Sequence, residues 1–246
     1  MRFTVLGAVS VRCSGEERRP YRARTRGLLG YLMMHAGHSV STGALIEALW
    51  GGAAPRTARG QVHSALTEIR GCLAGSGGVL TATPNSYRLV VPEGQLDVAV
   101  FEKSLRLARE AVRKGDDAAG AGLLVGALGL WAGEPFEGAS GAYVEAARAR
   151  LGEQRLCGVE DLAALRIRTG DPEDAVTVTG PLVDRYPLRE RLRARHVAAL
   201  YAAGCRAEAL HGFRAYRAVL RDREGLDPGP EITRLAEGIL RAQVSV

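Results

Sequence analysis

The chain has 246 residues, a formal net charge of +6, 46% hydrophobic residues and 24% charged residues. These values are typical of a soluble globular protein with one large or two modest domains. No apolar run reaches the ~18 residues that a membrane span requires, and the N-terminus lacks the cleavage pattern of a signal peptide, so the sequence indicates neither a membrane-spanning nor a secreted protein. Aromatic residues make up only 5%, which favours a helical core of Leu, Val and Ala over a β-sandwich.

The excess positive charge is confined to the first part of the chain. Residues 1–96 hold 11 Arg and 5 acidic residues, whereas residues 97–246 hold 22 basic and 22 acidic residues. A basic module beside a neutral one points to a head that binds a polyanion on a neutral body, although a random fluctuation of surface charge gives the same counts. Arg outnumbers Lys by 31 to 2, which a GC-rich genome also explains.

The basic part is predicted to contain strands, three helices and a hairpin. Residues 2–13 alternate apolar and polar side chains, as in one strand or two short ones. Gly37 ends the first helix, and Ser41 or Thr42 caps the second. The expected elements are strands within 2–13 and near Arg18 to Arg22, separated by a turn at Ser14–Gly15, helices over 24–36, 43–50 and 56–73, and a hairpin of 79–83 with 87–91 whose tip is Pro84, Asn85 and Ser86.

The third expected helix, over residues 56–73, has two different faces. One is an apolar stripe at three- and four-residue spacing, and the other carries hydroxyls, an imidazole and an arginine with few bulky groups. Eighteen residues make a helix roughly 27 Å long, enough to cross a major groove. An ordinary amphipathic surface helix has the same pattern. The stripe consists of Val62, Ala65, Leu66, Ile69 and Leu73, and the polar face of Gly60, His63, Ser64, Thr67, Arg70 and Gly71.

This order of elements is the plan of a winged helix-turn-helix. In that fold the third helix enters the major groove of DNA, and the hairpin lies along the phosphates or reaches the minor groove. The fold class expected for the whole chain is therefore mostly α, with an α+β winged helix-turn-helix followed by an all-α domain.

The second part has helical periodicity and an internal repeat. Gly170–Asp171 with Asp174–Ala175 recurs as Gly204 with Glu208–Ala209, an offset of 34 residues. A turn glycine followed by a small residue at a helix crossing is typical of tetratricopeptide-like helical hairpins. The expected helices cover 97–115, 122–131, 143–170 and 232–242, with Asp116 to Leu130 as a weaker first copy of the repeat and Glu224 to Glu231 as the break before the last helix.

Several segments together resemble one protein family. In the first part these are RARTRGLLGYLMMHAGHSVSTGALIEALWG, TARGQVHSALTEIRGCL and PNSYRL, and in the second LDVAVFE, ALGLWAGEPF, YPLRERL, ALYAAGCRAEAL and EGLDPGPEI. They are similar to the Streptomyces antibiotic regulatory proteins, transcriptional activators with an OmpR-type winged helix and a bacterial transcriptional activator domain. The resemblance covers nearly the whole chain. Because no GxxxxGK[ST] phosphate loop is present, we expect a small member without the ATPase extension.

The resemblance implies a winged helix-turn-helix domain over residues 1–93 and a tetratricopeptide-like activator domain over 97–246. It also implies a cytoplasmic, nucleoid-associated protein that needs no cofactor and contacts no membrane. Two copies would bind direct repeats in the promoters of a secondary-metabolite cluster and recruit the RNA polymerase holoenzyme through its sigma and alpha subunits. The implied DNA contacts are His63, Ser64, Thr67 and Arg70 on the third helix, Asn85, Ser86 and Arg88 on the wing, and Arg24, Arg26, Arg56, Thr57 and Arg59 on phosphate.

The third helix departs from the family pattern at two positions. Relatives carry basic residues late in this helix, where this chain has Glu68 and Gly71. Glu68 either accepts a hydrogen bond from cytosine N4 or lies near solvent and repels phosphate. Gly60 and Gly71 each cost about 1 kcal/mol in helix propensity. We therefore expect weaker non-specific DNA affinity than is typical of the family.

The sequence leaves two other classes of function to compare with a DNA-binding activator. An enzyme is disfavoured, because His35 and His38 have no carboxylate within a turn to complete a metal site and no nucleophile elbow is present. A pure interaction scaffold, with a basic head that has no specific DNA target, remains the alternative, and the salt dependence of binding separates the two. Trp131 and Tyr143 either line a ligand groove or pack in the core. Cys13, Cys72, Cys157 and Cys205 are expected to be reduced, buried thiols.

Overall fold

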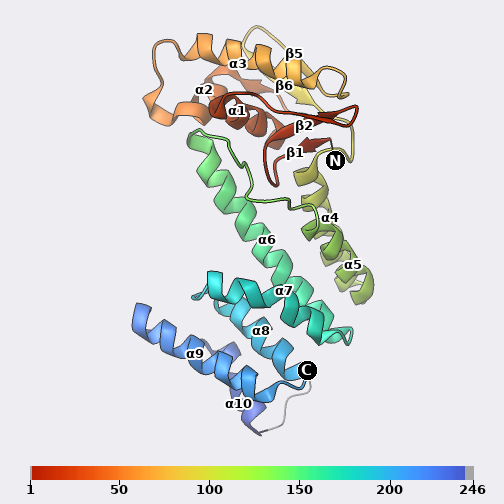
Figure 1. The fold of residues 1–246 in the computed structure, drawn as a ribbon, viewed down its shortest axis with the longest axis vertical. Helices are drawn as coiled ribbons and strands as arrows, with labels where there is room; N and C mark the ends of the chain where they lie inside the picture. The colour runs from red at the N-terminus through yellow and green to blue at the C-terminus, as the bar shows by residue number, and fades with distance from the viewer. Residues whose placement is uncertain (1, 242–246) are drawn as a thin grey trace. The chain divides into compact units, whose positions relative to one another are not determined.

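The computed structural model describes residues 2–241, which are mostly helical with a small β region near the N-terminus (Figure 1). The chain forms two compact units: a first unit of Met1–Ser104 with Gly126–Gln154, and a second unit of Leu105–Val125 with Arg155–Val246. None of the helices in the described part of the chain is long and apolar enough to cross a membrane.

The first unit begins with a three-stranded antiparallel sheet. Strands β1 (Phe3–Thr4), β2 (Ser10–Cys13) and β3 (Glu16–Arg18) follow one another in the order β1-β2-β3. Of the two alternatives predicted for residues 2–13, one strand or two short ones, the structure has the two short strands. The third strand was predicted too late, near residues 18–22. Strand β3 begins already at Glu16, because Ser14 and Gly15 both adopt positive φ and complete the turn in two residues.

Three helices and a hairpin follow, as predicted. They are α1 (Ala23–Met34), α2 (Thr42–Trp50), α3 (Ala58–Leu73), β5 (Val79–Ala82) and β6 (Ser86–Val90), with a short 3₁₀ turn, η1 (Gly51–Ala53), between α2 and α3. The Ser41 hydroxyl caps α2 by accepting the Ala44 N–H at 3.1 Å. A two-residue strand that the sequence did not predict, β4 (Val40–Ser41), pairs with β6, so the second sheet has the order β4-β6-β5.

The loop between helix α5 (Asp117–Leu128) and helix α6 (Ala142–Arg168) packs within the first unit. Its backbone pairs with the β1–β2 turn through the Ala132 N–H to Leu6 and the Phe136 N–H to Val5, both at 2.9 Å. It also lies against α1 so closely that a Cβ on Gly30 would stand 2.4 Å from the Phe136 ring. This packing explains why residues 126–154 belong to the first compact unit. The domain limits at residues 93 and 97 stay a prediction.

A buried carboxylate joins the first strands to the start of α4 (Asp97–Arg113). Asp97 is 2% exposed and accepts the N–H groups of Val5, Leu6 and Val98 at 2.6 to 3.1 Å. Burial raises the pKa of this carboxyl to about 6, although the three N–H donors favour its charged form. Asp97 therefore satisfies the backbone of the β1–β2 turn from another part of the chain.

Helix α5 (Asp117–Leu128) begins earlier than predicted. The prediction placed its start at Gly122, but Asp116 accepts the Ala119 N–H at 2.9 Å and so caps the helix five residues sooner. Helix α6 (Ala142–Arg168) runs 27 residues, which confirms the long helix expected over 143–170.

The predicted repeat is confirmed in the second unit. Helices α7 (Pro172–Arg185), α8 (Glu190–Ala202), α9 (Arg206–Glu224) and α10 (Pro230–Arg241) are joined by short connections, and α7 packs on α8 and α8 on α9. Gly170 and Gly204 adopt φ of +83° and +80°, and five residues later Ala175 and Ala209 are fully buried. The predicted end of the last helix, Ala242, lies outside the described residues.

The same spacing identifies the weaker first copy of the repeat. Gly115 adopts φ of +82°, and five residues later stands Gly120. A Cβ at Gly120 would lie 3.0 Å from a Val112 methyl group and 3.4 Å from a Leu165 methyl group. A small residue is needed there because α5 approaches its neighbours closely, as α7 and α9 do at their alanines.

Candidate nucleic-acid interface

Helix α3 separates its two faces as the sequence predicts. Val62, Leu66 and Ile69 are at most 1% exposed, while His63, Ser64, Thr67 and Arg70 are exposed. The buried stripe packs on α1 and α2. The polar face is held rigidly by that packing and presents short side chains, which lets another surface approach the helix backbone.

The two hydroxyls on this face donate their hydrogens within the helix. Ser64 donates its hydroxyl hydrogen to the Gly60 carbonyl and Thr67 donates to the His63 carbonyl, each at 3.1 Å. A hydroxyl whose hydrogen is engaged in this way keeps its lone pairs for incoming donors. In this arrangement Ser64 and Thr67 present hydrogen-bond acceptors to a ligand.

Four of the arginines that are predicted to contact phosphate or bases have guanidinium groups without a partner in the described residues. Arg56, Arg59, Arg70 and Arg88 are exposed, and none makes a hydrogen bond or an ion pair through its side chain with any residue within 2–241. Each guanidinium has five N–H donors. They are therefore available to an external anion.

The two arginines of α1 differ from one another. Arg24 is exposed, with its guanidinium 5.2 Å from the centre of the Trp50 ring. Arg26 instead donates to three backbone carbonyls, those of Pro20, Tyr21 and Gly138, at 2.7 to 2.9 Å. Arg26 thus has a structural task that its place in the sequence did not indicate, since carbonyl partners far along the chain leave no pattern.

Glu68 also has a structural partner that the sequence did not reveal. Its carboxylate accepts the Tyr21 N–H at 2.5 Å. Together Glu68 and Arg26 hold the backbone of residues 20 and 21 against the flank of α3, and the Tyr21 side chain is left 90% exposed. Neither expected role of Glu68, base contact or phosphate repulsion, accounts for this contact.

The hairpin is fixed to the start of α2. The Thr42 N–H donates to the Asn85 carbonyl at 3.0 Å, and the Ser86 hydroxyl lies 2.8 Å from that of Ser39 and 2.6 Å from that of Thr83. Ser86 belongs to strand β6 rather than to the tip. At the other predicted phosphate contact, Thr57 accepts the Gln61 amide at 2.9 Å.

The aromatic residues beside the loop pack on other rings. Trp131 lies edge-on to Phe101 with ring centres 5.4 Å apart, and Tyr143 lies edge-on to Tyr31 at 4.7 Å. These geometries are the favourable ones for aromatic pairs. Both residues are half-buried; the ring contact describes Trp131 as a packing residue, whereas Tyr143 also lines a pocket together with Tyr31 and Glu47.

The four cysteines form no disulfide within the described residues. The prediction that all four are buried was wrong, since only Cys13 is buried and the other three are partly exposed. No set of three or more His, Cys, Asp or Glu side chains in the described residues is arranged to hold a metal ion.

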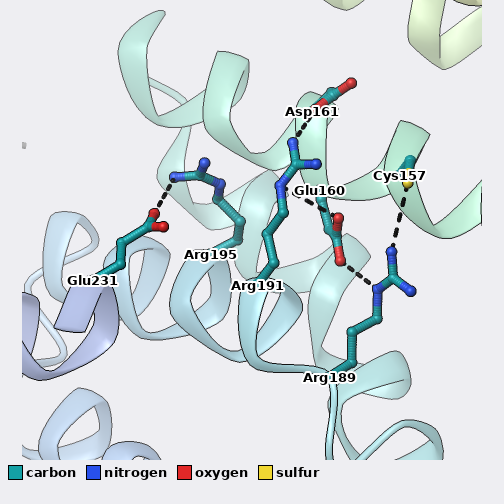
Figure 2. Close-up of polar contacts among 7 residues, drawn as sticks. All are labelled: Cys157, Glu160, Asp161, Arg189, Arg191, Arg195 and Glu231. Atoms are coloured by element: carbon teal, nitrogen blue, oxygen red, sulfur yellow. Dashed lines mark hydrogen bonds and ion pairs between the residues drawn. The ribbon is translucent and has the colours of Figure 1, made fainter. Parts of the chain in front are cut away.

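Two of the family segments meet in the second unit. In YPLRERL, Arg189 and Arg191 pair with Glu160, which is fully buried, and Arg191 also pairs with Asp161 (Figure 2). Glu190 of the same segment accepts the Gly229 N–H of EGLDPGPEI at 2.8 Å. A Cβ at Gly229 would lie 2.2 Å from this carboxylate, so a side chain there would displace the carboxylate.

The chain is similar to known regulators over nearly its whole length. The profile of the bacterial transcriptional activator domain matches residues 96–240. Regulatory protein AfsR of Streptomyces coelicolor is 36% identical over 98% of this chain and 24% of its own length, and Transcriptional regulator RedD of the same organism is 30% identical over 97% and 70%. The solved structure of Mycobacterium tuberculosis EmbR in complex with a low affinity phosphopeptide has a TM-score of 0.90 at 28% identity, covering 98% of this chain and 65% of that one.

The chain spans about a quarter of the length of the AfsR proteins that it matches. The profile covers more than half of the chain, and the similarity to RedD extends over most of both proteins. On these grounds the chain belongs to the Streptomyces antibiotic regulatory protein family of transcriptional activators, whose members carry the bacterial transcriptional activator domain.

Proposed function

We propose that the chain is a sequence-specific DNA-binding activator of a secondary-metabolite gene cluster. In this proposal residues 1–93 form a winged helix-turn-helix domain and residues 97–246 the activator domain. The observation that carries the proposal is the exposed polar face of α3, flanked by arginines that have no partner in the described part of the chain. Family membership supports the regulatory role, and the charge excess in residues 1–96 supports a polyanionic ligand.

Helix α3 enters the major groove in this proposal. Ser64 and Thr67 accept hydrogen bonds from the exocyclic amino groups of adenine or cytosine, because their own hydrogens are engaged within the helix. His63 and Arg70 read neighbouring base edges. The phosphate contacts are assigned to Arg24, Arg56, Thr57 and Arg59, and the wing contacts to Asn85, Ser86 and Arg88. Arg26 contacts phosphate only if its guanidinium donates to the phosphate and to its three carbonyl partners at the same time.

Two copies of the chain bind direct repeats in a promoter, and the activator domain presents a surface to the sigma and alpha subunits of RNA polymerase. Phosphate contacts place each copy in register, and base contacts choose the site. Holding the polymerase at the promoter raises the rate of initiation. The protein acts in the cytoplasm on the nucleoid, as a non-enzymatic regulator without a cofactor.

The test is a gel shift on promoter fragments of the neighbouring gene cluster at two salt concentrations. The Arg70→Ala variant is compared with Arg106→Ala, which removes an exposed, unpaired arginine from α4, outside the proposed interface. Specific shifts that weaken with salt, disappear in Arg70→Ala and persist in Arg106→Ala support the proposal. Specific shifts that survive Arg70→Ala move the reading face away from α3. No specific shift on any fragment contradicts the proposal and favours the interaction scaffold.

A further inference from the structure

The second unit contains a cavity that the proposed DNA binding does not use. It has a volume of about 450 Å³ and lies among the second halves of α4, α5 and α6, and α8. Cavities of this size accommodate small organic ligands. Every residue that lines it belongs to the second unit.

The cavity has an apolar floor. Ala108, Leu124 and Leu165 are at most 3% exposed, and Val112 and Ala164 line it beside them. These side chains leave no hydrogen-bonding group at the bottom of the cavity. The floor therefore suits hydrocarbon or aromatic carbon rather than a hydrated ion.

The rim is strongly cationic. Five arginines line the cavity, while Asp161 is the acidic residue among its lining side chains. Two walls carry them in pairs one helical turn apart: Arg109 and Arg113 on α4, and Arg191 and Arg195 on α8. Figure 2 shows the α8 pair extending from one side of that helix.

The arginines of α8 and α6 already have carboxylate partners. Arg191 pairs with Glu160 and Asp161, Arg195 contacts Glu231 at 3.9 Å, and Arg168 makes a two-point ion pair with Asp117 at 2.7 and 2.8 Å. Those charges are largely balanced within the protein. They frame the mouth but hold no surplus of positive charge.

The α4 pair is different. Arg109 and Arg113 are exposed and make no hydrogen bond or ion pair through their side chains with the residues that the structure describes. Like charges four residues apart on a helix repel one another. An anion placed between them would relieve this repulsion and accept charge-assisted hydrogen bonds from both guanidinium groups.

From this combination we infer that the cavity is a binding site for a small organic acid with an apolar body. Its carboxylate lies between Arg109 and Arg113, and its carbon skeleton covers the floor formed by Val112, Leu124 and Leu165. Burial of the skeleton supplies affinity, and the arginine pair selects a negative charge. The inference concerns the second unit alone and does not depend on DNA binding.

The test uses the full chain and isothermal titration calorimetry with two probes of this class, decanoate and 2-naphthoate. Decylammonium, which has the same chain length and the opposite charge, tests charge selection, and a ten-residue polyglutamate peptide tests whether negative charge alone suffices. The double variant Arg109→Gln with Arg113→Gln is compared with Arg106→Gln, a matched loss of an exposed, unpaired arginine from the same helix. None of these residues is buried, so circular dichroism should be unchanged in both variants.

The expected result is 1:1 binding of at least one organic acid, weakened about tenfold or more in the double variant and unchanged in Arg106→Gln. Binding should also raise the Tm of the wild-type chain. The inference is overturned if neither acid binds at millimolar concentration, if decylammonium binds as well as decanoate, or if Arg106→Gln weakens binding as much as the double variant. Binding of polyglutamate in place of the acids would overturn it too, because that result describes a charged groove for acidic protein.

Discussion

Arginine has different surroundings in residues 1–96 and in helices α6 to α10 of this chain. In the first unit Arg56, Arg59 and Arg88 are exposed and contact no carboxylate of the described chain. In the second unit Arg166, Arg168 and Arg191 each pair with an Asp or Glu. The excess of positive charge lies in residues 1–96, which make up only part of the first unit.

The difference teaches that arginine content by itself does not identify a polyanion-binding surface. A guanidinium that already donates to a carboxylate has lost part of its capacity for an external phosphate, whereas an unpaired one has kept it. A GC-rich genome can supply arginine to both units, but only the pairing shows which arginines remain available. Substitutions of paired and unpaired side chains test this difference.

The largest expected effect is in the second unit, at Glu160. Its side chain is fully buried between Arg189 and Arg191. Glu160→Ala leaves a cavity and removes the shared partner of two guanidinium groups, which should lower the free energy of unfolding by about 3 kcal/mol. Urea denaturation followed by circular dichroism measures this loss in the free energy of unfolding.

The matched control is Glu237→Gln, which removes an exposed ion pair with Arg241 one turn away on α10. Such surface pairs contribute at most about 0.5 kcal/mol. Equal losses for Glu160→Ala and Glu237→Gln would mean that the pairing in the second unit is incidental to its stability.

The second prediction concerns the buried carboxylate of the first unit, Asp97, which is held by backbone N–H groups and not by arginine. Both carboxyl oxygens accept hydrogen bonds and keep a lone pair for them when the group is protonated, whereas the amide nitrogen of Asn cannot accept, so Asp97→Asn places an amide N–H against a backbone N–H. The free energy of unfolding should fall by about 1–3 kcal/mol at pH 5. Thermal or urea denaturation measures the loss.

Asp97 also makes stability depend on pH with a definite sign. Its folded pKa of about 6 lies above the value of roughly 3.9 for an unfolded Asp, so the folded state binds the proton more tightly. The stabilisation that follows from the raised pKa of Asp97 is fully present below about pH 4 and is lost as the pH rises through about 6. The stability gap between wild type and Asp97→Asn should therefore be larger at pH 5 than at pH 7. A gap that widens with rising pH would contradict the raised pKa.

Most elements of the fold could be predicted because their signals are local. Ser41 before α2, the positive-φ glycines at 170 and 204, and the turn residues Pro84 and Asn85 of the hairpin each act within a few residues. Strand β4 could not be predicted, since two residues carry no periodicity and its existence depends on pairing with β6, more than 40 residues away. The start of α5 was missed although Asp116 is a local capping signal.

The candidate interface could be predicted only as a face. Helical periodicity placed His63, Ser64 and Thr67 together, and their exposure agrees. It could not distinguish Arg24 from Arg26, since the carbonyl partners of Arg26 lie as far away as Gly138. Hydrogen bonds to backbone carbonyls depend on tertiary placement, and any residue type can supply the carbonyl.

The third prediction sets an unpaired arginine against a paired one. Arg59→Gln should reduce the salt dependence of promoter binding by about one unit of slope, and affinity by a few-fold, with little change in stability. Arg166→Gln, which loses ion pairs with Asp171 and Asp174, should leave the slope unchanged. Fluorescence anisotropy at several salt concentrations measures both. An equal change in the salt dependence of promoter binding in the two variants would show that paired and unpaired arginines do not differ in their contact with DNA.

The smallest expected effect is at Glu68, the exception in the first unit because it is an acid on the proposed DNA-binding helix. If its main task is to hold the Tyr21 backbone, Glu68→Ala should weaken promoter binding and lower stability by about 1 kcal/mol, because the 20–21 segment loses one of its two attachments. Glu68→Gln keeps an oxygen that can accept the Tyr21 N–H and removes only the charge. It should therefore bind DNA as tightly as wild type or more tightly, since any repulsion of phosphate is relieved. Tighter binding by both variants would show that Glu68 affects DNA through its charge alone, and the attachment of Tyr21 would then have no part in recognition.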